Sequence, residues 1–181
     1  MDKRDDRRVL MTKRMLKQTL IELLKKKDIY HISIRELCEA ADVNRTTFYK
    51  HYGSQFELLG DMEKDILEVI TKAFRRNESN PEKIIYAVCS YLEDNIELAR
   101  IIINNNVDPS FAHNLFAMNH IKENALRNLS GPKNAAEFEY AYNFITYGAF
   151  RAVCVWLNKE DRESPEFIAK LIAKMMPGYP S

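Results

Sequence analysis

Residues 32–52, ISIRELCEAADVNRTTFYKHY, have the pattern of two short helices joined by a tight turn. Ser33 stands three positions before Glu36, the spacing at which a hydroxyl and a carboxylate cap the start of a helix. The first helix should end near Asp42, because Asp is one of the few residues that tolerate the positive φ often found after a helix. Asn44 is placed to cap the second helix. The stretch therefore predicts a small helical hairpin.

The second helix of this hairpin has an apolar and a polar side. Phe48 points toward the first helix, while Arg45, Thr46 and Tyr49 project elsewhere at about 100° per residue, with Lys50 at the margin. A helix-turn-helix lays its second helix in the major groove of DNA, where Arg can donate two bonds to guanine and Thr can meet a thymine methyl. From these residues alone, a solvated helical hairpin with a charged face is an equal alternative.

The run from Ser33 to Leu59 resembles the DNA-binding domain of the TetR family of transcriptional regulators. The matching segments are VNRTTFYKHY at 43–52 and SQFELL at 54–59. The resemblance implies a helical homodimer with one helix-turn-helix per subunit and a C-terminal domain that binds an effector or a partner. Three positions depart from the family pattern: Asp42 replaces a common Gly, Cys38 a common Ala, and Gln55 a Lys that often contacts phosphate.

Two sets of residues are predicted to contact double-stranded operator DNA. The set expected to touch bases is Arg45, Thr46 and Thr47. The set expected to touch phosphates is Ser33, Tyr49, Lys50, His51 and Gln55.

The charge is divided unevenly along the chain. Residues 1–52 hold 13 Lys or Arg and 8 Asp or Glu, a net +5, whereas residues 53–181 carry a net −4. The positively charged part of the chain is therefore the part that contains the motif. Salt screens charges more than about 10 Å away, so DNA binding depends on the charge near the motif and not on the net charge of the protein. Lys3, Arg4, Arg7 and Arg8 form a basic arm, which is either solvated or in contact with phosphate or the minor groove.

The apolar positions repeat at three and four residues, which predicts an all-α fold of about nine helices. The domain boundary is expected near residue 53, with a helix-turn-helix domain at 1–53 and a helical effector-binding and dimerisation domain at 54–181. The expected helices outside the hairpin cover 7–26, 54–76, 81–94, 95–104, 108–129 and 134–157, with a last helix opening at Ser164-Pro165.

Several classes of protein are disfavoured by what the sequence lacks. No apolar run of 18 residues exists and no signal-peptide core follows the charged start, so we expect a cytoplasmic protein without a membrane span. Three widely spaced cysteines, Cys38, Cys89 and Cys154, argue against a disulfide framework and a C-x-x-C metal site.

The second domain offers little for catalysis. His113 and His120 lie about 10 Å apart along a helix, too far to share one ion. No nucleophile elbow, zinc-protease motif or glycine-rich phosphate loop is present. We therefore expect no enzyme activity, no metal and no cofactor.

Aromatic residues of the second domain either fill its core or line an apolar ligand pocket. The candidates for ligand contact are Tyr86, Phe111, Phe116, Phe144, Tyr147 and Phe150.

The helix expected at 134–157 is apolar on most sides, and we expect it and the last helix to pair with their copies in a four-helix dimer interface. The alternative is that they only close the core of the monomer. The predicted dimerisation residues are Ala149, Ala152, Trp156, Ile168, Leu171, Ile172 and Met175.

The leading hypothesis is a dimeric, sequence-specific DNA-binding regulator of transcription, controlled by a small-molecule or protein effector at the C-terminal domain. The second hypothesis is a helical adaptor that acts through a protein partner without a small-molecule ligand. A gel shift on the protein's own upstream region at about 150 mM salt separates the two.

Overall fold

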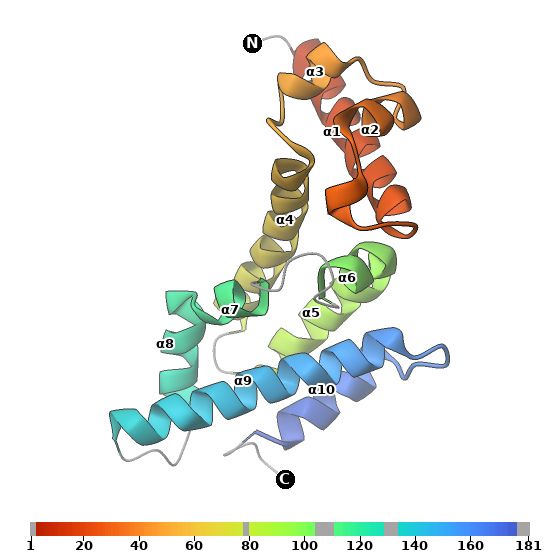
Figure 1. The fold of residues 1–181 in the computed structure, drawn as a ribbon. Coiled ribbons are helices and arrows are strands. Elements are labelled where there is room, and N and C mark those ends of the chain that lie inside the picture. Colours follow the sequence, from red (N-terminus) through yellow and green to blue (C-terminus); the bar gives the residue numbers. More distant parts are fainter. Residues whose placement is uncertain (1–2, 78–79, 104–110, 129–133, 177–181) are drawn as a thin grey trace. The chain divides into compact units, whose positions relative to one another are not determined.

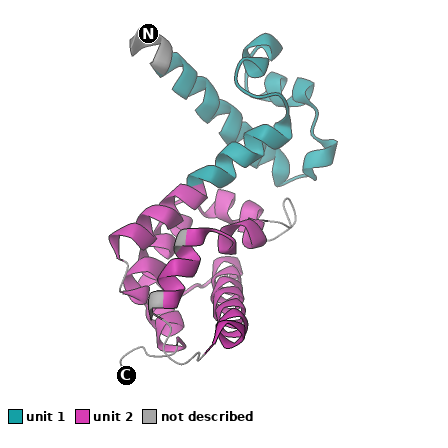
Figure 2. Ribbon diagram, turned by 90° about the vertical axis from the view of Figure 1, so that its left-hand side faces the viewer, with its two compact units in different colours: residues 1–65 teal, residues 66–181 magenta. Residues whose placement is uncertain are grey.

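The computed structural model describes residues 3–77, 80–103, 111–128 and 134–176, and all regular structure in these ranges is helical. The predicted all-α fold is therefore confirmed, with ten α-helices in the described ranges where about nine were expected. The chain divides into two compact units, Met1–Asp65 and Ile66–Ser181 (Figure 2). This division falls inside a helix, whereas the sequence suggested a boundary near residue 53.

The first unit is a group of helices around one apolar core (Figure 1). Its elements are α1 (Lys3–Leu24), the 3-10 turn η1 (Ile29–His31), α2 (Ile34–Ala40), α3 (Arg45–Tyr49) and the first half of α4 (Gln55–Arg76). The side chains that fill its core are Leu16, Leu20, Ile29, Ile32, Leu37, Phe48, Leu58 and Met62, all buried.

Helix α1 begins earlier than predicted, at Lys3 rather than near Arg7. The sequence ahead of Arg7 contains neither Gly nor Pro, so nothing in it stops the helix from extending. The segment expected to be a basic arm is therefore the first part of a helix.

The second unit contains the rest of α4 and six further helices (Figure 1). These helices are α5 (Pro81–Asp94), α6 (Ile96–Ile103), α7 (Phe111–Phe116), α8 (Asn119–Asn128), α9 (Ala135–Asn158) and α10 (Pro165–Lys174). Helix α10 packs along α5, and α9 touches α6, α7, α8 and α10.

The start signals read from the sequence are confirmed in this unit. Pro81 and Pro165 occupy the first turns of α5 and α10. Asn80 and Ser164 cap these helices, each with a side-chain oxygen that accepts a backbone N–H of the first turn.

The prediction of a single helix over 108–129 is wrong, because the helix is interrupted at Ala117 and Met118 and forms two helices, α7 and α8. The break leaves the carbonyl of Phe116, the last residue of α7, outside the helical ladder. The hydroxyl of Tyr142 on α9 donates to this carbonyl at 2.7 Å. A tertiary hydrogen bond thus takes the place of a helical one. The expected start at Asp108-Pro109 lies outside the described residues.

All three cysteines, Cys38, Cys89 and Cys154, are buried and unbridged. Burial raises the pKa of each thiol, that of Cys89 to about 12.

No helix in the described ranges has the length and apolar character needed to cross a bilayer.

Candidate DNA interface and ligand cavity

The turn between α2 and α3 is held by two caps and one left-handed residue. Ser33 Oγ accepts the backbone N–H of Glu36 at 3.1 Å, and Asn44 Oδ1 accepts that of Thr46 at 2.8 Å. Asp42, between the caps, has a φ of 51°. The two caps and the positive φ confirm what the sequence predicted for this turn.

The outer face of α3 is polar and open to solvent. Arg45, Thr46, Tyr49 and Lys50 are exposed, whereas Phe48 on the inner face is fully buried. Within the described part of the chain, Arg45 and Lys50 have no ion-pair or hydrogen-bond partner. Their charges are available to an anionic partner.

Two other cations near α2 are already paired. Arg35 Nε donates to Glu39 at 2.8 Å, one helical turn away, and Lys27 Nζ donates to Glu36 at 2.6 Å. The Arg35–Glu39 pair could be predicted from its i,i+4 spacing on one helix. The Lys27–Glu36 pair joins two different segments and was not predicted from the sequence.

Three further predicted DNA contacts flank this face. Ser33 is exposed, and because its oxygen acts as an acceptor in the cap, its hydroxyl proton is available to an outside acceptor. Thr47 and His51 are half-buried. The ring of His51 lies 6.5 Å, centroid to centroid, from that of Tyr52.

Gln55 is half-buried in the first turn of α4, where backbone N–H groups favour a phosphate. Ser54 Oγ accepts the N–H of Glu57 at 3.2 Å, and the Glu57 carboxylate accepts the N–H of Gly53 at 2.7 Å. The negative charge of Glu57 therefore lies at the start of α4 and accepts one of the backbone N–H groups there. For this reason Gln55 is less favourably placed to contact a phosphate than the exposed residues of α3.

A charged cluster that sequence reasoning missed joins α1 to the first half of α4. Lys17 Nζ lies 3.0 Å from Asp61 and 2.6 Å from Asp65. The hydroxyl of Tyr52 donates to the same Asp61 at 2.8 Å, and Lys13 lies 5.2 Å from the centre of the Tyr52 ring. We call these five residues the α1–α4 clamp.

Hydrogen bonds within the α1–α4 clamp stabilise its charged forms. Burial alone would raise the pKa of Asp61, but donors on Tyr52 and Lys17 hold it below its usual value. Burial alone would lower the pKa of Lys17, but Asp65 and Asp61 raise it. Burial and the bond to Asp61 raise the pKa of Tyr52, which keeps it a neutral donor. At neutral pH, Asp61 and Lys17 are therefore charged and Tyr52 is neutral.

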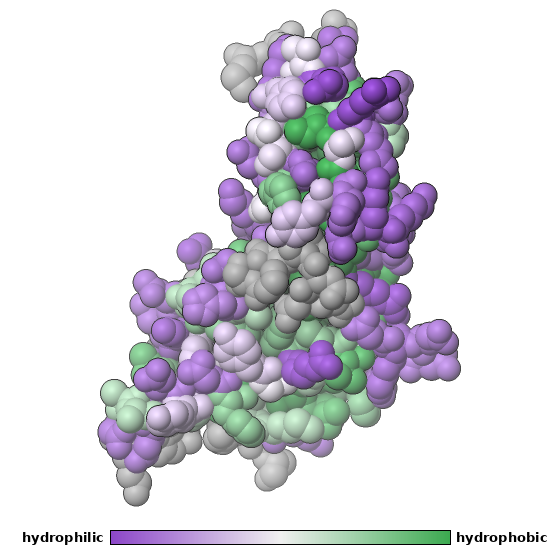
Figure 3. Space-filling view, in the orientation of Figure 1, coloured by the Kyte–Doolittle hydropathy of each residue, from purple (hydrophilic) through white to green (hydrophobic). Residues whose placement is uncertain are grey.

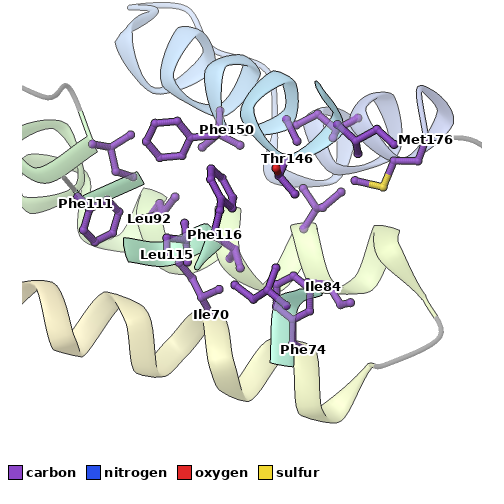
Figure 4. A pocket seen from close by; sticks show the side chains of 18 residues that line it. Ile70, Phe74, Ile84, Leu92, Phe111, Leu115, Phe116, Thr146, Phe150 and Met176 are labelled. Carbon is purple, nitrogen blue, oxygen red and sulfur yellow. The ribbon is translucent and has the colours of Figure 1, made fainter. Parts of the chain in front are cut away.

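The second unit contains a partly open apolar cavity of about 150 Å³ (Figure 4). Helices α4 to α10 all contribute to its wall. The lining residues are Ile70, Phe74, Ile84, Ile85, Val88, Leu92, Ile103, Phe111, Leu115, Phe116, Ile121, Ile145, Thr146, Ala149, Phe150, Val153, Ile172 and Met176.

Half of the predicted ligand contacts line this cavity, namely Phe111, Phe116 and Phe150. Two other predicted contacts, Tyr86 and Phe144, are 41% and 83% exposed and do not line this cavity. On α9 the cavity side includes residues 146, 149, 150 and 153, and the helical period turns Phe144 away from it.

Tyr147, another predicted ligand contact, does not line the apolar cavity either. Its ring packs 4.9 Å from that of Phe116, and it lines a separate open groove with His113, Lys122 and Glu139. Within the described residues, no three His, Cys, Asp or Glu side chains are grouped as a metal site.

The predicted dimerisation residues fall into two groups. Trp156, Ile168 and Ile172 lie in the core of the protomer, so for them the prediction is corrected. The indole N–H of Trp156 donates to the carbonyl of Glu163 at 2.6 Å, which fixes the loop between α9 and α10.

The other four predicted dimerisation residues remain accessible. Ala149 and Ala152 are half-buried, while Leu171 and Met175 are exposed.

Exposed apolar side chains form two stripes, which include the predicted dimerisation residues Leu171 and Met175. The residues of the stripes are Tyr140, Phe144 and Val155 on α9, and Phe167, Leu171 and Met175 on α10. Figure 3 shows apolar surface gathered over α9 and α10. Gly148 lies in the α9 stripe, and a Cβ added there would meet nothing within 4 Å.

The comparisons with known proteins agree on one family. A TetR family model described as "Transcriptional regulator C-terminal region" matches residues 79–178. The "Uncharacterized HTH-type transcriptional regulator YxbF" of Bacillus subtilis (strain 168) is 24% identical over 176 residues. The match covers 89% of this chain and 43% of YxbF, so the chain spans less than half the length of that relative.

Solved structures share the fold. A TetR transcriptional regulator from Streptococcus agalactiae 2603V aligns with a TM-score of 0.70 at 20% identity, covering 94% of this chain and 96% of that one. The "Dihydroxyacetone kinase operon activator DhaS" aligns with a TM-score of 0.61 at 17% identity, covering 92% and 94%. With the family match over more than half of its length, this chain belongs to the TetR family of transcriptional regulators.

Proposed function

We propose that the protein is a dimeric regulator of transcription that binds operator DNA through α3. The observation that carries the proposal is the exposed face of α3, where Arg45 and Lys50 have no partner among the described residues. The capped turn with Asp42 at positive φ fixes the angle of that helix against α2. A rigid, cationic helix of this kind suits the major groove.

The roles of the residues follow from their chemistry. Arg45 can donate two bonds to one guanine, and Thr46 and Thr47 can meet a thymine methyl or accept a bond. The predicted phosphate contacts are Ser33, Tyr49, Lys50, His51 and Gln55, which would set the register of α3 without reading sequence.

Dimerisation would supply two copies of α3 for two half-sites about one helical turn of DNA apart. The exposed stripes on α9 and α10 support this assembly, because apolar side chains clustered on a surface favour association. The open space over Gly148 allows a second helix to approach closely.

The dimer is tested with the double variant Phe144→Asp, Phe167→Asp in sedimentation velocity. Wild type should sediment as a dimer at micromolar concentration and the variant as a monomer with unchanged helix content. Leu126→Asp is the matched control, because Leu126 is an exposed apolar residue of α8 outside the stripes. A monomeric wild type would refute the dimer.

Helix α4 is the element through which an effector would act. Its second half contributes Ile70 and Phe74 to the cavity wall, and its first half holds Asp61 and Asp65 of the α1–α4 clamp. An occupant that displaces Ile70 and Phe74 would move a helix anchored to the DNA-binding unit. A fold neighbour is named an activator, so the proposal covers activation as well as repression. We propose that the protein acts in the cytoplasm, where it would meet the cell's own operators.

Fluorescence anisotropy on the protein's own upstream DNA and on random DNA at about 150 mM salt tests the function. Specific regulators bind their sites about 10³-fold or more tighter than random DNA. Equal affinity for both DNAs would overturn the proposal and favour the adaptor that acts through a protein partner.

A further inference from the structure

We propose that the cavity of the second unit accepts a small uncharged hydrocarbon, about the size of a substituted benzene ring, and rejects charged molecules. This inference rests on the proposed effector control and names the class of effector.

The chemistry of the wall excludes charge. Of the 18 lining residues that the structure describes, 17 are apolar and the other is Thr146. The Thr146 hydroxyl donates to the carbonyl of Tyr142 at 2.6 Å on its own helix, so its proton is not available to a ligand. A carboxylate or ammonium would therefore lose its hydration and gain no partner, which is strongly unfavourable.

A neutral carbonyl is disfavoured for the same reason. It needs a hydrogen-bond donor, and no free donor is found among the described residues that line this cavity. A buried acceptor without a donor is penalised, whereas a hydrocarbon requires no partner. The expected order of affinity is hydrocarbon first, then alcohol, then carbonyl compound, with ions last.

The size and shape of the cavity favour a ring. Cavities of about 150 Å³ lined by Leu, Ile and Phe stay dry and bind benzene. Phe116 and Phe150 meet edge to face, with ring centroids 5.8 Å apart and an interplanar angle of 89°. Figure 4 shows both rings and Phe111 among the side chains around the space. A ligand ring can extend this edge-to-face arrangement.

The open groove beside α9 provides an internal contrast. Its lining includes His113, Lys122, Glu139 and Asn143, all polar. We expect a polar or charged molecule that binds the second unit to bind in this groove. Substitutions in the apolar cavity should then leave the affinity for that molecule unchanged.

The test is a thermal-shift series with toluene, benzyl alcohol, benzaldehyde, benzoate and benzylammonium, which share one ring and differ in polarity. With the full chain at pH 7.5, toluene at ten times its Kd should raise Tm by about 3–5 °C, and the two ions should have no effect. Stabilisation by benzoate equal to that by toluene, abolished by filling the cavity, would overturn the inference.

Variants that fill the cavity test whether toluene binds inside it. Val88→Phe fills the cavity from α5 and should abolish the response to toluene while circular dichroism shows a folded chain. Ile145→Phe, from α9, takes its place if the first variant fails to fold. The control Thr146→Val keeps the volume and removes the hydroxyl, and its toluene affinity should stay within twofold of wild type. A tenfold loss in this control would show a polar anchor and refute the inference.

DNA binding measured in parallel separates the two proposals. Toluene binding that leaves operator affinity unchanged would support the ligand class and refute effector control. Specific DNA binding with no thermal response to any of the five compounds would overturn the ligand class and leave the DNA-binding proposal standing.

Discussion

The two halves of α4 lie in surroundings of opposite kind. The half in the first unit contributes Leu58 and Met62, both fully buried, to the core and is held by the α1–α4 clamp. The half in the second unit borders a cavity of about 150 Å³ through Ile70 and Phe74. Filled cores resist deformation, whereas side chains around a void lack contacts on one side. The helix thus has a rigid end and an end whose surroundings can be changed by an occupant.

The sharpest way to test this contrast is to delete a phenylalanine from each unit. Phe48→Ala in the first unit should destabilise the protein by about 3–5 kcal/mol, because the ring is fully buried in the core. Phe116→Ala should destabilise by less than half as much, because the ring is half-buried and borders a space that already exists. Urea unfolding measures both, and equal losses would contradict the contrast.

A second prediction separates stability from recognition within the rigid unit. Arg45→Ala should weaken specific DNA binding by about 1–3 kcal/mol and relax sequence preference, with little change in Tm because the side chain is exposed. Lys50→Ala should weaken binding to all sequences alike and reduce the salt slope by about one per subunit. Anisotropy titrations at several salt concentrations measure both effects. Equal losses on operator and random DNA from Arg45→Ala would rule out its base-reading role.

The turn of the helix-turn-helix gives a third prediction. Asp42→Val places a β-branched residue at a φ of 51° and should destabilise the first unit by about 1–2 kcal/mol. Asp42→Gly removes the steric conflict and should be neutral or stabilising. Calorimetric Tm values compare the pair. A valine variant as stable as the glycine variant would show that the turn adapts.

The smallest predicted effect concerns the α1–α4 clamp. Asp61→Asn should destabilise by about 1 kcal/mol at pH 7, a value reduced for partial exposure of the carboxylate. The pKa of Asp61 is lower in the folded state than its ordinary 3.8, so its contribution is complete above that value. It is lost as the pH falls through the lowered folded pKa.

The difference between wild type and Asp61→Asn should therefore shrink below about pH 4. Denaturant unfolding from pH 7 to pH 3 measures this change. A difference that stays constant over this range would show that the Asp61 charge does not stabilise the fold.

Features set by local sequence were predictable. The caps at Ser33 and Asn44 and the positive φ of Asp42 depend on neighbours within four residues, and all three are present. At the break in the expected 108–129 helix, the free carbonyl of Phe116 is bonded by Tyr142, which is 26 residues away in sequence. The same holds for the α1–α4 clamp, since Lys17 and Asp65 are 48 residues apart.

The second unit was harder to read because α9 is apolar on most sides. Periodicity alone does not tell which apolar side faces the core, the cavity or solvent. Trp156 was therefore assigned to a dimer interface although it is buried, and Phe144 to the cavity although it is exposed. Helix α9 packs against α6, α7, α8 and α10, and these contacts become visible only in the structure.

The buried cysteines have a practical consequence for following motion in this protein. Thiolates are the species that react with maleimides, and burial both raises the thiol pKa values and blocks access to Cys38, Cys89 and Cys154. A single cysteine introduced at an exposed site outside the proposed DNA interface, such as Met11→Cys, would then take up a fluorescent or spin label selectively. The three natural cysteines need not be replaced before the DNA-binding unit is labelled for spectroscopy.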